Sequence, residues 1–212
     1  MTKEARFKPD FYTRIDWYAM DKNGHIALME NFGWGDIPYS LQKLQEWSER
    51  LDDFNEYIYE ELTPYTPYPN KNGGFELDIY GSVMYSHRKP GGKPYKILSR
   101  NEVIRDLLET YSIKPKNSPL SLATRKGIFT YRGVEGYKEG DDTPVGFDGD
   151  FKMGDYYRFL RPTEYLKISE LPAPLRQYVC VSNSIDFNKD RLIESQHIDS
   201  YFPNTYRPSS ED

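Results

Sequence analysis

Apolar and polar residues alternate most clearly over Ile15–Asn31, which reads "IDWYAMDKNGHIALMEN". In the first half, Trp17 falls on the same side as Ala19, and the polar turn "DKNG" separates it from a second apolar run. An Asn-Gly pair in that position favours a β-hairpin with a type I′ turn, in which both central residues have positive φ. The pattern therefore predicts a hairpin with one buried face and one face in water.

A second pattern, with steps of three and four residues, extends from Ser40 to Leu62 and predicts one long amphipathic helix. Its apolar stripe consists of Leu41, Leu44, Trp47, Leu51, Phe54, Ile58 and Leu62. Its other face carries Glu46, Glu49, Asp52, Asp53, Glu56, Glu60 and Glu61. Because the hairpin needs a cover, we expect a shared core of Trp17, Leu44, Trp47, Leu51 and Phe54. The acidic face has two interpretations, a merely solvated surface or a surface that binds a partner.

Weaker patterns complete the fold prediction. A second helix is expected to open at Ser99, where Glu102 completes a capping box. Further strands are predicted at 75–79, 127–132, 156–160 and 178–181. Together these elements predict an α+β fold, a mainly antiparallel sheet that starts with the N-terminal hairpin, with two principal helices packed on one face. We expect a single domain over 1–212, and a subdivision near the proline-rich segment 63–74 is the alternative.

Composition narrows the classes of partner. The net charge of −5 disfavours nucleic acid, because phosphate-binding domains normally have a basic surplus, and it permits a basic protein partner. No apolar run is long enough to cross a bilayer, and the first residues lack the apolar core of a signal peptide. We therefore expect a cytoplasmic protein without a membrane partner. The single cysteine, Cys180, lies in an apolar run and is interpreted as a buried structural thiol.

Motifs for catalysis are not found in the sequence. It contains no phosphate loop, dinucleotide fingerprint, nucleophile elbow or zinc-protease helix, and His25, His87 and His197 are widely separated. The Gly- and Asp-rich stretch at 139–155 offers a fragment of a calcium loop without its terminal Glu. We therefore expect no cofactor and no metal. A small hydrolase or transferase, with a site assembled from scattered Asp, Glu and His, stays as the alternative function.

Two segments carry a family resemblance. The segment 16–38, "DWYAMDKNGHIALMENFGWGDIP", and the segment 156–172, "YYRFLRPTEYLKISELP", resemble two elements of uncharacterised bacterial proteins. Some of those proteins are considered immunity proteins of polymorphic toxin systems. The two segments cover about a fifth of the chain and contain no catalytic signature. The resemblance implies neutralisation of a cognate toxin by protein contact, and it defines no residues to carry over.

These observations favour a non-enzymatic binding protein that uses acidic and aromatic surface residues. Tyrosine is abundant, with 19 copies, and has both an apolar ring and a polar tip. The candidate binding residues are Trp34, Asp52, Glu56, Tyr68, Asp141, Asp142 and Asp148. For Trp34, between two glycines, anchoring in the core is the competing interpretation. For Tyr68 it is packing against the neighbouring helix.

Overall fold

The computed structural model describes residues 6–10, 13–59, 71, 73–81, 102, 105, 119–136, 142 and 144–207. Eight strands of this part of the chain form one mixed sheet, which confirms the α+β class. In their order across the sheet, the strands are β3 (Phe75–Leu77), β5 (Tyr156–Pro162), β4 (Phe129–Gly133), β2 (Ile26–Glu30), β1 (Asp16–Met20), β6 (Cys180–Val181) and β8 (Asn204–Thr205). The short β7 (Leu192–Ile193) pairs with β5.

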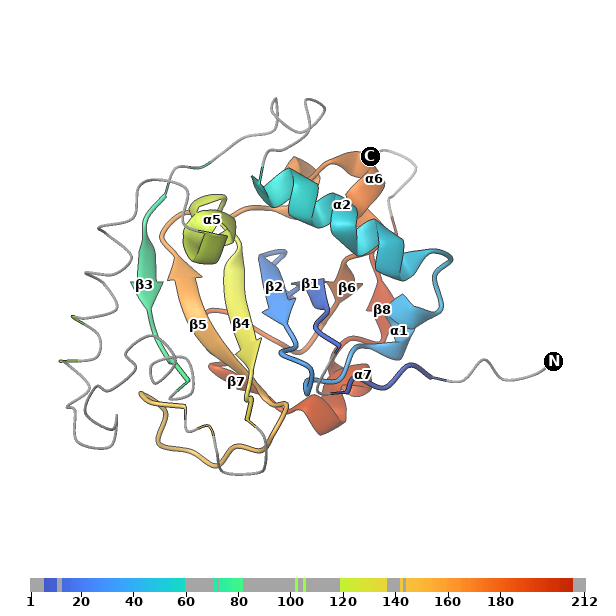
Figure 1. Ribbon diagram of the computed structural model, residues 1–212. Coiled ribbons are helices and arrows are strands. Elements are labelled where there is room, and N and C mark those ends of the chain that lie inside the picture. The colour runs from blue at the N-terminus through green and yellow to red at the C-terminus, as the bar shows by residue number, and fades with distance from the viewer. Residues whose placement is uncertain are drawn as a thin grey trace.

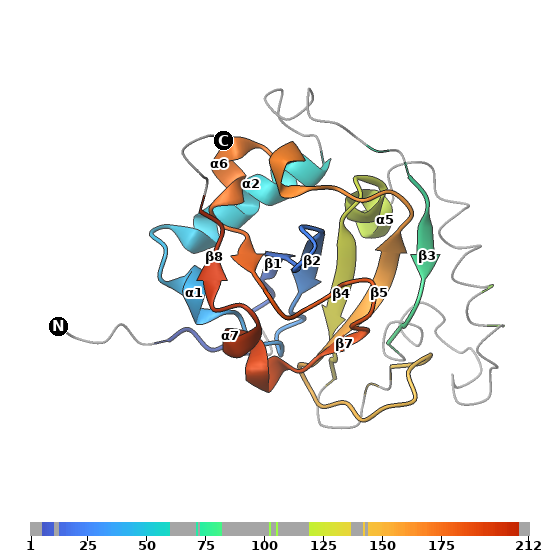
Figure 2. The same ribbon diagram turned by 180° about the vertical axis from the view of Figure 1, so that it is seen from behind.

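Helices lie around this sheet (Figures 1 and 2). The described ones are α1 (Tyr39–Gln42), α2 (Trp47–Tyr59), α5 (Pro119–Arg125), α6 (Ala173–Arg176) and α7 (Ile198–Tyr201), with 3₁₀ turns at Ile168–Glu170 and Ser195–His197. In Figure 1, α2, α5 and α6 gather along the upper margin of the sheet and α7 lies near the lower margin. No helix in the described ranges is both long enough and apolar enough to span a bilayer.

The predicted N-terminal hairpin is confirmed: β1 and β2 pair antiparallel, with Tyr18 opposite Leu28. Its turn differs from the prediction, because Gly24 has φ 78° while Asn23 does not adopt positive φ. The backbone N–H of Gly24 donates to the Asp21 carbonyl, and that of Asp21 donates to the His25 carbonyl. The result is a three-residue loop that ends in a left-handed glycine, a common alternative to type I′.

The prediction that one face of the hairpin lies in water is wrong. Trp17 and Tyr18 point to opposite faces of β1, and both side chains are fully buried. Trp17 meets Tyr156 and Phe202 edge-on, while Tyr18 stacks on Phe54 of α2 with 3.9 Å between the ring centroids. The hairpin stands at the centre of the sheet, between parallel partners β4 and β6, and is covered on both sides. Continuous apolar runs are typical of strands in that position.

The long helix predicted from Ser40 is interrupted. Its first turn ends at Gln42 and α2 begins at Trp47, because Glu46 adopts φ 55°, outside the helical range. The Glu46 carbonyl then accepts the Arg50 N–H at 3.0 Å and opens α2. Residues 60–62 lie outside the described part of the chain.

The predicted shared core is confirmed, but two of its residues are less buried than the others. Trp17, Leu51 and Phe54 are buried in one apolar cluster, whereas Leu44 and Trp47 pack at its edge and stay half-buried. The interruption of the helix explains the difference, because it moves both side chains to the rim of the core. Trp47 is therefore accessible from outside the fold.

Several other predictions can be compared with the structure. The predicted strands at 75–79, 127–132, 156–160 and 178–181 correspond to β3, β4, β5 and β6, with shifted ends. Cys180 is buried, as expected. The second predicted helix lies outside the described residues except for Glu102 and Arg105, which are helical. Most of segment 63–74 is also outside them, and the strands on either side of it join one sheet.

Candidate protein-binding site

An open hollow of about 640 Å³ lies where α1 meets α2. Its lining consists of Phe7, Tyr39, Gln42, Lys43, Leu44, Gln45, Glu46 and Trp47. The hollow is a direct result of the helix interruption, since the residues that leave the helical path form its wall. The rings of Phe7 and Trp47 meet at a centroid distance of 6.0 Å, and the Lys43 ammonium lies 4.4 Å from the Tyr39 ring centroid. Half-buried aromatic rings thus face an accessible space.

The walls of this hollow are fixed by polar contacts. The Phe7 N–H donates to the Gln42 side-chain oxygen at 3.0 Å, which holds the N-terminal segment against α1. Asp199 of α7 accepts from the Tyr39 N–H at 2.8 Å and pairs with Arg6 at 2.6 Å. The aromatic rings are therefore positioned before any partner arrives, which lowers the entropic cost of binding.

An acidic stripe adjoins the hollow along α2. Glu49, Asp52, Asp53 and Glu56 are spaced at three and four residues, so they share one side of the helix. Glu49 and Asp52 are exposed, whereas Asp53 and Glu56 are half-buried. Between positions 46 and 56 the sequence has five carboxylates and one guanidinium, Arg50, which pairs with Glu46 and Asp53. A negative field therefore lies along the α2 side of the aromatic hollow.

The structure places some predicted binding residues here and others elsewhere. Asp52 and Glu56 belong to the acidic stripe. Asp148 is exposed in the loop before β5, where its charge acts on Arg191. Trp34 is half-buried, in the turn that follows β2. Tyr68 and Asp141 lie outside the described residues.

The prediction of a surface role for Asp142 is wrong. Its side chain is buried, with 1% of the residue exposed. Burial, and after it the neighbouring Asp142 carboxylate, raises the pKa of Glu135 to about 7. The Glu135 backbone N–H lies 3.5 Å from an Asp142 oxygen. Asp142 is therefore part of the interior charge pattern, and a partner cannot reach it in this structure.

A cluster of charged side chains lies beside the central strands. The two carboxylate oxygens of Glu30 accept from Arg132 Nε at 2.5 Å and from Arg14 Nη2 at 2.8 Å. The Arg132 side chain is only 1% exposed, and its guanidinium stacks 3.8 Å from the Phe159 ring centroid. In the β1–β2 register, Asp16 stands directly opposite Glu30, so two like charges face each other.

Asp16 is the carboxylate of this cluster whose negative charge is least compensated by neighbouring cations. Burial, and then the Glu30 carboxylate, raises the pKa of Asp16 to about 6. Its Oδ1 atom is buried and accepts no hydrogen bond from any described residue. The neighbouring guanidinium of Arg14 stays 3.7 Å away at Nε. Asp16 and Glu135 are therefore carboxyls near this cluster that hold a proton at mildly acidic pH.

This arrangement predicts a fold that loses stability as pH rises. Asp16 and Glu135 have raised pKa values in the folded state, so the folded chain binds more protons than the unfolded chain between about pH 4 and 7. We expect the unfolding free energy to fall by on the order of 2 kcal/mol from about pH 5 to pH 8, with solvent screening reducing the share of half-buried Glu135. Glu170 and Asp186, with lowered pKa values, change stability below this window.

Denaturant melts across that pH range measure the effect. The variant Asp16→Asn should flatten the profile, because it removes one of the carboxyls with a raised pKa while keeping the side-chain shape. A profile that rises with pH in the unmodified protein would contradict the assignment.

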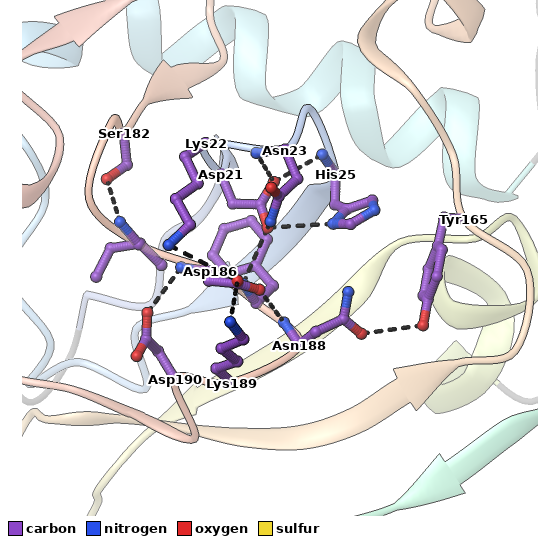
Figure 3. Close-up of polar contacts among 12 residues, drawn as sticks. Asp21, Lys22, Asn23, His25, Tyr165, Ser182, Asp186, Asn188, Lys189 and Asp190 are labelled. Atoms are coloured by element: carbon purple, nitrogen blue, oxygen red, sulfur yellow. Dashed lines mark hydrogen bonds and ion pairs between the residues drawn. The ribbon is translucent and has the colours of Figure 1, made fainter.

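A third polar group holds the hairpin turn to the C-terminal part of the chain (Figure 3). Asp21 Oδ1 accepts from the backbone N–H groups of Asn23 and His25, both at 2.9 Å, and Oδ2 accepts from the Phe187 N–H at 3.0 Å. His25 Nδ1 lies 3.1 Å from Oδ2, and its ring contacts Tyr165 at 4.6 Å between centroids. The Asp21 side chain is fully buried.

An aspartate next to a histidine also occurs in hydrolases, where the carboxylate orients the base. Here the carboxylate of Asp21 is saturated by three backbone N–H groups, and His25 is 8% exposed. In the neighbouring "DFNKD" loop, the aspartates accept hydrogen bonds from backbone N–H groups of the same loop. Asp186 accepts the Asn188 N–H at 3.1 Å, and Asp190 accepts the Asp186 N–H at 2.7 Å. The described residues contain no group of three potential metal ligands. These contacts favour a structural role.

Sequence reasoning missed Phe7 and Tyr39 as part of the site and assigned Trp47 to the core. The signal that joins them is a backbone angle at Glu46, which its residue type does not indicate. Comparisons of the chain with family models, with curated proteins and with solved structures give no match.

Proposed function

We propose that this protein is a non-enzymatic binding protein that neutralises a basic protein toxin by contact. The binding site would be the α2 surface, defined as the aromatic residues Phe7, Tyr39 and Trp47 together with the acidic stripe Glu49, Asp52, Asp53 and Glu56. One observation supports this most: three half-buried aromatic rings line an open hollow beside four carboxylates of one helix. Protein interfaces concentrate their binding energy in buried aromatic anchors, and charge complementarity guides the partner to them.

The two parts of the α2 surface have different physical roles. Exposed carboxylates such as Glu49 and Asp52 attract a basic partner from a distance, which raises the association rate and makes it sensitive to salt. Trp47 offers a large ring that loses few rotamers when it is covered, so it slows dissociation. Toxin neutralisation is the role that the family resemblance implies, and it requires both fast capture and slow release.

The test is association with the protein encoded next to this one. Glu49→Lys combined with Asp52→Lys should slow association at low salt by about tenfold or more and weaken its salt dependence. The fold should stay intact, since exposed substitutions usually change stability by less than about 0.5 kcal/mol. Association rates at low and high salt give the measurement.

The matched control reverses two exposed charges away from α2, Asp148→Lys with Asp150→Lys. If the control slows association and the α2 variant does not, the binding surface is the loop before β5. If the product of the neighbouring gene is toxic and stays fully toxic on co-expression with the unmodified protein, neutralisation of that product is excluded.

A further inference from the structure

A smaller hollow, of about 130 Å³, lies between α2 and the start of β1. Its lining consists of Arg14, Ile15, Asp16, Ser48, Leu51, Asp52 and Asn55. Ser48, Asp52 and Asn55 are four and three residues apart, which places them on one side of α2. A water molecule takes roughly 30 Å³ of liquid, so the hollow has room for about four waters. That is the size of one side chain, and it is below the roughly 300 Å³ at which small-molecule pockets begin.

The lining is apolar in one part and acidic in another. Leu51 is 4% exposed and Ile15 is half-buried, so both offer a hydrocarbon surface. Asp16 and Asp52 contribute carboxylates from two different elements, the first strand and the helix. Lysine and arginine side chains match this lining, because each has an aliphatic stem that packs on apolar surface and a charged head that pairs with carboxylates.

Among the described residues, the carboxylates around this hollow outnumber the cations. Asp16, Glu30 and Asp52 are three carboxylates, and Arg14 and Arg132 are the two guanidiniums that contact this cluster. Both guanidiniums are engaged by Glu30, and Arg14, which is 54% exposed, also lies 3.7 Å from Asp16 Oδ1. Asp16 Oδ1 itself is shielded from solvent, but the Asp16 side chain as a whole keeps 25% exposure, and Asp52 is exposed. The hollow therefore has acceptor capacity that an incoming cation can use.

We propose that this hollow receives one arginine side chain of the protein partner. That the arginine belongs to a protein partner rests on the function proposed above, whereas the preference for a cation rests on the residues that line the hollow. Arginine fits better than lysine, because its planar guanidinium presents five donors and can reach acceptors on two elements at once. The bound cation would also stabilise the ionised form of Asp16, which burial and Glu30 otherwise disfavour.

N-acetyl-arginine methylamide is the probe for this site, followed by NMR on the isotopically labelled full chain. We expect the amide signals of Asp16, Ser48 and Asn55 to shift together, and the pKa of Asp16 to fall as the probe binds. Asp52→Asn should weaken binding by about tenfold or more, the loss expected for a charge-assisted hydrogen bond. Asp52 is exposed, so this variant keeps its fold.

The control is Asp53→Asn, which removes a carboxylate from the next position of α2 but not from the lining of the hollow. Weaker binding of the lysine analogue would support the preference for a guanidinium. Absence of shifts at the three amides, or equal losses in Asp52→Asn and Asp53→Asn, overturns the proposal.

The same variants separate this inference from the proposed function. If no protein partner binds but the arginine probe gives the expected shifts, the hollow is a cation site and the proposed function fails alone. If a partner binds the unmodified protein and the Asp16→Asn variant equally well, the proposed function stands and the arginine assignment is wrong.

Discussion

Replacing Glu30 with alanine should lower the unfolding free energy by about 3–5 kcal/mol. The change removes a carboxylate partner of Arg132, whose side chain is 1% exposed and whose Nε lies 2.5 Å from the Glu30 carboxylate. Arg132 would then keep its buried positive charge with one carboxylate fewer, and loss of a charged partner is among the costliest changes in a protein interior. Denaturant melts at neutral pH give the measurement.

A double variant separates the loss of the ion pair from the loss of packing. Glu30→Leu with Arg132→Met exchanges the charged pair for apolar side chains, and it should recover most of the stability that the single change removes, because no unpaired charge remains. Loss of less than about 1 kcal/mol in Glu30→Ala would mean that solvent reaches Arg132 and that the pair is weak.

Asp21→Ala is the second substitution with a large expected effect. Its carboxylate accepts hydrogen bonds from the backbone N–H groups of Asn23, His25 and Phe187, at 2.9 to 3.0 Å (Figure 3). Each buried donor that loses its acceptor costs roughly 1–3 kcal/mol, so we expect a total loss on the order of 3–5 kcal/mol. The turn should also separate from the 185–190 segment, and hydrogen exchange at the three amides would report that separation.

Asp21→Asn is the matched control. The amide keeps one oxygen for the two N–H groups of the turn, while its NH₂ group cannot accept from Phe187. Its loss of stability should therefore fall between those of the unmodified protein and Asp21→Ala. Equal losses in the two variants would show that the contact with Phe187 dominates and that the turn bonds contribute little.

The hairpin could be predicted because its signals are local. Alternating side chains and an Asn-Gly pair act over a few residues, and β1 and β2 formed where they indicated. The type of turn could not be predicted from the neighbouring residues alone, because the Asp21 side chain also accepts a hydrogen bond from the Phe187 N–H, 166 residues away. The strand order could not be predicted either, because β4 and β6 are brought to the hairpin by contacts across most of the chain.

The candidate site was predictable in its charge and not in its shape. Asp52 and Glu56 were expected on one helix face, and α2 places them there. The aromatic hollow depends on the positive φ of Glu46, for which no residue type gives a warning. Asp142 was expected at the surface because it lies in a polar, glycine-rich stretch, but it is buried close to Glu135.

The central place of the hairpin has a consequence for synthesis of the chain. β1 and β2 leave the ribosome before their outer neighbours, because β2 pairs with β4 at 129–133 and β1 pairs with β6 at 180–181. At about 5–20 residues per second, β6 follows β1 after roughly 10–30 s. During that interval Trp17 and Tyr18, which both end fully buried, have no completed sheet to cover them. The nascent chain thus exposes an aromatic strand pair whose unpaired edges favour aggregation until β4 and β6 are synthesised.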